Sequence, residues 1–339
     1  MNKTDINIIK QKLETKQQIV IVHHKNPDGD ALGSSLSLSM LLKKLGHQVN
    51  VISPNDYPEY IGWLPEADQI CVFDTHRAVA EQLIAEATVI FTLDFNALHR
   101  VGEDLEVILS VKKAFFAMID HHQNPDDYAD YIFSDTQYGS TCQMIYHFAE
   151  QLNLLELLDK DIATCIYTGI VTDSGSFKFP RTTATLHRVV ATLIDIGVDN
   201  VLIHNLLFDN SSYSRLKLLG RALEKMVILE DLQSAYIVLT KEDLEQCGYK
   251  KGDSEGMVNY PLTIKGINFS AFFMENDVES DVRISFRSLG DFDVNLFAQN
   301  FNGGGHKNAA GARSKLSLAD TVEKFKEIVK KNNPKTQNV

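Results

Sequence analysis

Imidazole and carboxylate side chains gather in a short stretch near the N-terminus, His-His-Lys-Asn-Pro-Asp-Gly-Asp, which begins at His23. Within it, His24, Asp28 and Asp30 offer one ring nitrogen and two carboxylates. An oxygen-rich set with one nitrogen suits Mn²⁺ or Mg²⁺ better than metals that prefer thiolates. The same residues also suit a plain turn in which an aspartate caps the next helix. The stretch by itself leaves both interpretations open.

The apolar run before this stretch indicates where its side chains should lie. Residues 19–22 are consecutive Ile and Val, which is typical of a buried parallel strand, and residues 31–45 have helical composition. The polar cluster therefore follows the carboxyl end of a strand. Open α/β sheets place their ligand sites at that edge.

Further acidic and imidazole side chains stand at equivalent positions later in the chain, namely Asp94, Asp120, His121, His122 and Asp173. The first follows a predicted strand at 88–93, the next three follow one at 114–119, and the last follows a predicted helix at 159–170. Taken singly, each is equally compatible with a helix cap or a local hydrogen bond. Because strand ends in one parallel sheet lie side by side, the repetition predicts one shared crevice.

Strands and helices alternate through this part of the chain, which predicts an α/β domain with a parallel sheet. The other expected strands are 18–22, 47–52 and 70–73, and the other expected helices are 6–13, 78–87, 141–152 and 185–196. At 339 residues the chain is too long for one ordinary core, so a second domain is expected. Our boundaries are 1–196 for the first domain, 197–232 for a helical linker and 233–332 for the second domain.

Composition excludes several functional classes. A formal net charge of -12 argues against coating long nucleic acids, but it is compatible with a small anionic substrate at a metal site. The four cysteines are isolated in sequence, which favours a reducing cytosol over a disulfide framework. There is neither an apolar signal core at the start nor an apolar run of membrane-spanning length. We expect a soluble cytoplasmic protein without a membrane partner.

The expected second domain carries two candidate anion-binding features, one at Arg287 and Ser288 and one at Gly303, Gly304, Gly305 and His306. Consecutive glycines let successive backbone N–H groups point into one concavity, and an arginine adds a bidentate phosphate contact. A flexible turn and a solvated surface charge explain the same residues equally well. The predicted strands around them are 235–239, 267–274 and 282–286.

Together, the His24–Ser35 stretch, Asp94, the Asp120-His121-His122 triplet and Asp173 resemble the four motifs of the DHH phosphoesterase superfamily. Residues 303–311, Gly-Gly-Gly-His-Lys-Asn-Ala-Ala-Gly, resemble the signature of the DHH-associated domain. Motif order and chain length are most similar to the nanoRNase branch, whose members also dephosphorylate 3'-phosphoadenosine 5'-phosphate (pAp). One departure is Asn96-Ala97, where relatives often carry other small or acidic residues.

The resemblance implies a parallel-sheet DHH domain, a helical linker and a smaller α/β DHH-associated domain. It also implies a site for two divalent metal ions, with Asp94 as the bridging ligand. One ion would be held by His24, Asp28 and Asp94, and the other by Asp30, Asp94, His121 and Asp173. Mn²⁺ is expected because imidazole nitrogens suit it better than Mg²⁺, with Mg²⁺ or Co²⁺ as alternatives.

Roles for the remaining candidates follow from the same resemblance. His122 would stabilise charge on the scissile phosphate or assist the leaving group, and Asp120 would orient a histidine. The substrate-binding candidates are Arg100, Arg287, Ser288, Gly303, Gly304, Gly305 and His306.

The expected activity is hydrolysis of short oligoribonucleotides of about 2–5 nucleotides to mononucleotides, together with dephosphorylation of pAp to AMP, by a water activated at two metal ions. One alternative is a phosphodiesterase for linear dinucleotides from cyclic dinucleotide signalling. Another is a nucleotide-binding sensor without catalytic activity. The sequence leaves open whether the chain forms a homodimer.

Overall fold

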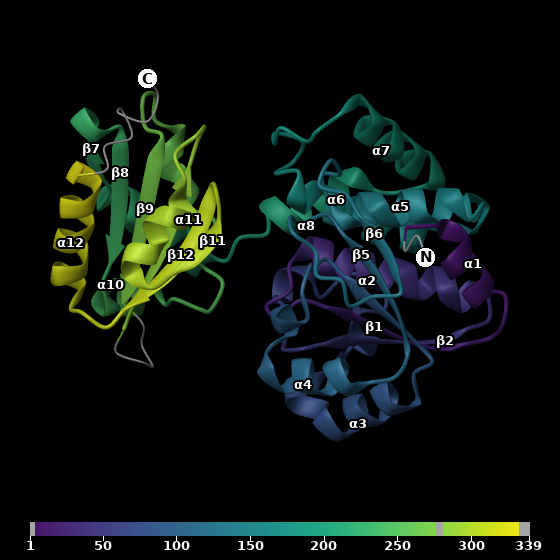
Figure 1. Ribbon diagram of the computed structural model, residues 1–339. Helices are drawn as coiled ribbons and strands as arrows, with labels where there is room; N and C mark the ends of the chain where they lie inside the picture. Colours follow the sequence, from purple (N-terminus) through teal and green to yellow (C-terminus); the bar gives the residue numbers. More distant parts are fainter. Residues whose placement is uncertain (1–3, 276–280, 332–339) are drawn as a thin grey trace. The chain divides into compact units, whose positions relative to one another are not determined.

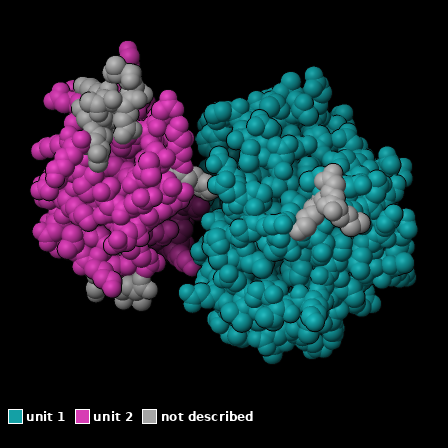
Figure 2. Space-filling view, viewed as in Figure 1, with its two compact units in different colours: residues 1–210 teal, residues 211–339 magenta. Residues whose placement is uncertain are grey.

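The computed structural model describes residues 4–275 and 281–331, and the chain divides after Asn210 into two compact units (Figure 2). In the described residues no single helix is both long and apolar enough to cross a bilayer. Two helices that reach this length and composition only as a pair, residues 184–196 and 200–208, are bent by 110°.

The first unit is built on a six-stranded parallel sheet with the strand order β3-β2-β1-β4-β5-β6. Its strands are β1 (Gln18–His23), β2 (Gln48–Ser53), β3 (Cys71–Val72), β4 (Val89–Leu93), β5 (Phe115–Asp120) and β6 (Tyr131–Ser134). The strand order reverses between β1 and β4. In doubly wound sheets that reversal opens the crevice that holds the ligand.

Helices cover both faces of this sheet (Figure 1). They are α1 (Ile6–Leu13), α2 (Gly29–Lys44), α3 (Phe73–Glu86), α4 (Glu103–Val111), α5 (Thr141–Gln151), α6 (Lys160–Asp173), α7 (Ala184–Ile196) and α8 (Asn200–Phe208). Ile19 and Ile21 of β1 pack with α2, α5 and α6, whereas Val20 and Val22 pack with α3 and α4. Burial on both faces explains why the strand is continuously apolar.

The crossing of α2 and α6 is unusually close because it is made by glycines. A methyl group at Gly33 would lie 2.5 Å from the Cys165 carbonyl oxygen, and one at Gly169 would lie 2.8 Å from Asp30 Oδ1. The two helices that carry Asp30 and Asp173 are thus held together at backbone distance.

The second unit contains a second six-stranded sheet, with the order β11-β12-β10-β9-β8-β7. Its elements are α9 (Tyr213–Glu224), β7 (Val227–Leu229), β8 (Ser234–Leu239), α10 (Lys241–Cys247), β9 (Phe269–Glu275), β10 (Val282–Ser288), α11 (Val294–Ala298), β11 (Gly304–His306), β12 (Ala309–Ser314) and α12 (Leu318–Lys331). One face packs α11 and α12 over a phenylalanine-rich core, and the other packs α9 and α10 over β8 and β9. A 3₁₀ helix, η6 (Met257–Thr263), completes the second layer.

Several elements differ from the prediction. The strand expected at 70–73 is only the two-residue β3, and α3 begins at Phe73 instead of residue 78. β6 and β7 were not predicted because they are only four and three residues long. β11 and β12 were not predicted because they are rich in glycine and alanine and lack a β-branched pattern. Segment 197–232 is shared between the units: α8 belongs to the first, while Leu218 and Ala222 of α9 pack into the second.

Candidate metal centre

The six predicted metal ligands converge at the carboxyl edge of the first sheet. Among the described residues, three overlapping groups have ligand atoms within 4.8 Å of one another. They are His24, Asp28 and Asp94; Asp30, His121 and Asp173; and Asp94, His121 and His122. Asp94 and His121 each belong to two groups, so the donor atoms form one connected cluster.

The first stretch contributes through two side chains that local hydrogen bonds hold in place. His24 Nδ1 lies 3.0 Å from the Lys25 carbonyl oxygen, which fixes Nδ1–H as the donor and leaves Nε2 3.4 Å from Asp94 Oδ2. Asp28 Oδ1 accepts hydrogen bonds from the backbone N–H groups of Asp30 and Ala31 at the start of α2. Asp28 is therefore a helix cap, as one of the two interpretations of the sequence expects, and it is at the same time a member of the cluster that could bind metal.

Asp30 and Asp94 are buried, and the N-terminus of α5 holds both of them. The Thr141 backbone N–H donates to Asp30 Oδ2 at 2.6 Å, and the Cys142 N–H donates to Asp30 Oδ1 at 2.8 Å. The Thr141 hydroxyl donates to Asp94 Oδ1 at 2.9 Å. Asp94 itself has φ 64°, a left-handed conformation that is uncommon outside glycine and is found at functional sites.

His121 connects three carboxylates. Its Nε2 lies 3.5 Å from Asp94 Oδ1, 3.2 Å from Asp173 Oδ2 and 3.9 Å from Asp30 Oδ2. Asp173 reaches this position because α6 ends there, before a turn that contains Gly175. The ends of strands and of α6 thus supply donors to the same cluster.

The neighbouring His122 is oriented by Asp120. Its Nδ1 lies 2.7 Å from Asp120 Oδ1, and Asp120 is fully buried at the end of β5. Within the described residues, the second oxygen of Asp120 has no hydrogen-bond partner. The pairing directs the other ring nitrogen of His122, Nε2, away from Asp120.

The electrostatics of the cluster show how closely its carboxylates are packed. Burial and the Asp94 carboxylate raise the pKa of Asp30 to about 8, and burial with Asp30 and Asp28 nearby raises the pKa of Asp173 well above its ordinary value. Burial opposes charge on the histidines, but the carboxylates outweigh it, so the pKa of His24 rises to about 9 and that of His121 to about 10. Without added cations, the cluster must therefore retain protons at neutral pH.

This donor set fits divalent cations. Buried carboxylates that lie close together repel one another too strongly to be ionised at the same time. Their ionisation becomes favourable when a cation lies between them. Carboxylate oxygens with a minority of imidazole nitrogens are ligands of Mg²⁺, Mn²⁺ and related ions. The acidic and histidine side chains here could therefore bind metal.

Thr141 was not identified from the sequence, where it is only the start of a predicted helix, and it gives a direct test of how Asp94 is held. Thr141→Val keeps the shape but removes the hydroxyl, so we expect metal affinity to fall about 10- to 100-fold. Thr141→Ser, which retains the hydroxyl, should bind nearly as the wild type does. Calorimetric titration of Mn²⁺ into metal-free protein measures both variants. Equal affinities for Val and Ser would show that the bond to Asp94 does not position it.

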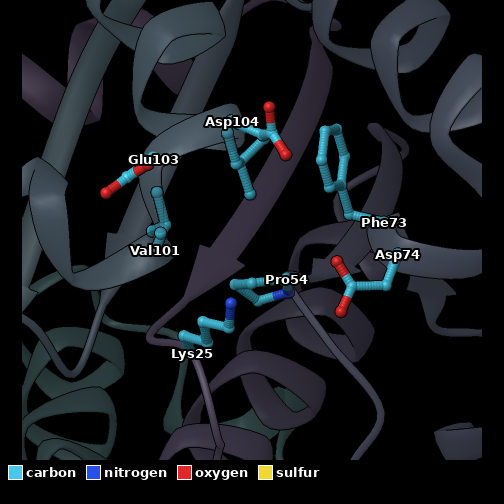
Figure 3. Close-up of a pocket in the computed structure, with 9 residues that line it drawn as sticks. Lys25, Pro54, Phe73, Asp74, Val101, Glu103 and Asp104 are labelled. Carbon is cyan, nitrogen blue, oxygen red and sulfur yellow. The ribbon is translucent and has the colours of Figure 1, made fainter.

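The first unit also contains a cavity of about 290 Å³, which none of the predicted ligands lines (Figure 3). Pro54 and Phe73 are among the apolar residues that line it, and Lys25, Asp74 and Asp104 are among the charged ones. Lys25, which lines the cavity, directly follows His24 in the chain.

The predicted substrate-binding residues do not all come together. In the second unit, Arg287, Gly304 and Gly305 line a cavity of about 320 Å³. Ser288 does not, because its buried hydroxyl donates to the Phe292 carbonyl oxygen. Gly303 packs against the backbone of β12, since a methyl group there would overlap Ala312.

The two other candidates are placed only in part. The side chain of His306 lies outside the described residues. Arg100 belongs to the first unit, on the 3₁₀ helix η3 (Leu98–Val101), where its carbonyl accepts a hydrogen bond from the Lys25 N–H.

Comparison with known proteins agrees with this architecture. Residues 18–170 match the model of the DHH family N-terminal domain, and residues 232–333 match the DHHA1 domain. The bifunctional oligoribonuclease and PAP phosphatase NrnA of Thermus thermophilus is 31% identical, over 92% of this chain and 89% of that protein. The protein of the same name from Bacillus subtilis is 28% identical, over 87% of this chain and 88% of its own length.

A solved structure is similar over nearly the full length. It is that of an exopolyphosphatase-related protein from Bacteroides fragilis, with 37% sequence identity and a TM-score of 0.94 over 97% of this chain and 96% of that one.

Proposed function

Since the chain belongs to the DHH family, we propose that it is a phosphoesterase that hydrolyses short oligoribonucleotides to mononucleotides and removes the 3'-phosphate of pAp. The observation that carries this proposal is the connected cluster of carboxylates and imidazoles around Asp94. The relatives named as oligoribonuclease and PAP phosphatase, which match this chain over most of its length, support the choice of substrates.

The geometry suggests a division of labour within the cluster. His24, Asp28 and Asp94 would hold one divalent ion, and a second would be held by Asp30, Asp94, His121 and Asp173. When bound, such ions supply an activated water and neutralise the oxygens of the phosphoryl group.

The protein's own side chains would donate the proton to the leaving group and hold the carboxylates in position. Asp120 holds the ring of His122 in place through Nδ1, and we propose that His122 donates a proton to the leaving oxygen or stabilises charge on the phosphate. Thr141 holds the Asp94 carboxylate beside that of Asp30, because its hydroxyl donates to Asp94 and its backbone N–H donates to Asp30. A serine or cysteine nucleophile is not needed for this chemistry.

The cavity of the second unit would bind an anionic group of the substrate. Arg287 is half-buried at its edge, and its Nη1 donates to the Phe286 carbonyl oxygen at 2.9 Å, which fixes the guanidinium. An arginine held in this way is suited to a phosphate or ribose oxygen. Gly304 and Gly305 are exposed at this cavity, and the Gly305 N–H donates to Asn295 Oδ1 at 2.8 Å.

Mn²⁺ is the metal we propose, because His24 and His121 bring nitrogen ligands to both halves of the cluster. Mg²⁺ and Co²⁺ are the alternatives. Metal-free protein reloaded with each ion at matched, subsaturating concentration should be most active with Mn²⁺. Equal or higher activity with Mg²⁺ would overturn this assignment of the metal.

The proposed function is tested with pure protein, Mn²⁺, pAp and labelled RNAs of two to twenty-four nucleotides. We expect pAp and RNAs of two to five nucleotides to be hydrolysed efficiently and the longest RNA poorly. Arg287→Ala should lower kcat/KM for the short substrates roughly tenfold to a hundredfold, because it removes a charge-assisted contact. Metal content should stay unchanged. Equal rates for a dinucleotide and a 24-mer would contradict the preference for short substrates, and binding without any turnover would indicate a sensor.

A further inference from the structure

One face of the second unit's sheet is only partly covered by helices. α9, α10 and η6 pack over β8 and β9 on this face, through side chains such as Ile237 and Phe272. Side chains alternate between the faces of a strand, and directly paired residues share a face. The uncovered part therefore presents Arg283, Ser285 and Arg287 from β10 and Ala309, Gly311 and Arg313 from β12.

Two arginines lie directly opposite each other on this surface. Arg283 of β10 pairs in register with Arg313 of β12, and both side chains are exposed. Like charges at facing positions of an antiparallel pair destabilise it. Arg313 Nη1 lies 3.2 Å from Asp281 Oδ2, whereas Arg283 has no ion-pair partner within residues 4–275 and 281–331. Because Arg283 faces a like charge and has no such partner among these residues, folding does not explain its presence in a chain with a net charge of -12.

Small residues separate the pair from the cavity at Arg287. Between them lies the cross-strand pair Ser285 and Gly311, and both of these residues line that cavity. Arg283 and Arg287 are four residues apart on one strand, which places their backbones about 13 Å apart. Because the side chains of Ser285 and Gly311 are small, the surface between Arg283 and Arg287 is open. A flexible, repeating anion fits such a path better than a single compact one.

We propose that Arg283 and Arg313 form a second phosphate subsite, which binds a phosphodiester group of the oligonucleotide beyond the nucleotide held at the Arg287 cavity. This proposal rests on the proposed function and extends it to substrate length. Guanidinium groups on an exposed sheet surface contact backbone phosphates without reading bases, so the subsite is independent of sequence. The ion pair with Asp281 holds the guanidinium of Arg313 in place.

The subsite distinguishes the two kinds of substrate. Both phosphates of pAp belong to one ribose, so we expect this molecule to occupy the Arg287 cavity alone. RNAs of four or five nucleotides have enough backbone to occupy both ends. Arg283 should therefore matter for oligonucleotides and not for pAp.

Arg283→Gln is the decisive variant, with Lys330→Gln as a matched control that removes one positive charge from α12, on the opposite face of the sheet. We expect Arg283→Gln to raise KM about three- to tenfold for RNAs of four and five nucleotides, the lower end reflecting solvent exposure. Kinetics with pAp and metal content should match the wild type. Arg283→Gln/Arg313→Gln should have a larger effect in the same direction.

Salt dependence gives a second, independent measurement. Binding of a fluorescent pentanucleotide to metal-free protein, followed by anisotropy, should lose about 0.7 from the slope of log affinity against log salt for each phosphate contact removed. An unchanged slope and KM in the double variant would overturn the proposal. So would an equal loss with pAp and pentanucleotide, because that indicates general damage. If the wild type hydrolyses neither substrate, the proposed function fails, and the anisotropy experiment still decides whether the subsite exists.

Discussion

Asp94→Asn is expected to lower kcat on the order of a thousandfold or more and to reduce the amount of bound metal. Asp94 carboxylate oxygens lie 3.4 Å from His24 Nε2 and 3.5 Å from His121 Nε2, so this residue joins both halves of the cluster. Asparagine tolerates the left-handed backbone at this position and keeps the size of the side chain, but it lacks the charge. The measurement is steady-state hydrolysis of pAp together with metal analysis of the purified variant.

Two comparisons make this prediction specific. Asp28→Asn should have a smaller effect on metal content, because Asp28 belongs to only one of the three groups. Asp195→Asn, which neutralises an exposed carboxylate on α7, should behave as the wild type does. Full metal content and activity in Asp94→Asn would show that Asp94 does not bridge two metal ions.

Gly169→Ala should destabilise the first unit by about 2 to 3 kcal/mol, in the range expected for overpacking a well-filled core. The added methyl group would overlap Cys142 Sγ and lie 3.0 Å from the Asp30 Cα. The sulfur is buried and the other contact is backbone, so neither can move away easily. Asp30 should be displaced from the N-terminus of α5, and metal affinity should fall with stability.

Gly220→Ala is the matched control for this substitution. Gly220 lies within α9, and a methyl group there would meet nothing within 4 Å. We expect this change to raise stability slightly, since alanine has a higher helix propensity than glycine. Thermal unfolding of both variants, with and without Mn²⁺, compares them. A wild-type melting temperature and metal affinity for Gly169→Ala would contradict the close crossing of α2 and α6.

The parallel sheet and its polar edge were predictable because local sequence encodes both. Strands buried on two faces are continuously apolar, as in β1 and β4, and a charged residue that follows such a run must lie at its carboxyl end. That reasoning places Asp94 and His121 on one edge, and the structure brings their side chains within 3.5 Å. The pairing of individual carboxylates with individual imidazoles depends on the order of the strands in the sheet. Hydrophobic periodicity along the sequence does not encode that order.

Other features depend on contacts between distant segments. Thr141 is an ordinary first residue of a helix until α5 packs beside α2, where its N–H and hydroxyl reach carboxylates 111 and 47 residues away. Similarly, the pairing of Arg283 with Arg313 follows from the register of β10 and β12. The latter strand, Ala-Ala-Gly-Ala-Arg-Ser, has no pattern that would predict it.

The double role of Asp28 restricts which substitutions at this position preserve both the fold and the cluster. Its carboxylate caps α2 and belongs to the cluster, whereas serine, threonine and asparagine, which cap helices about as well, carry no charge. A single-nucleotide change from aspartate to asparagine would therefore leave a stable fold with one carboxylate fewer in the cluster. Selection for folding alone would not remove that allele, so a duplicated copy could lose catalysis while it keeps its shape. The residue at this position is then a marker by which active copies and binding-only descendants of such a gene can be told apart.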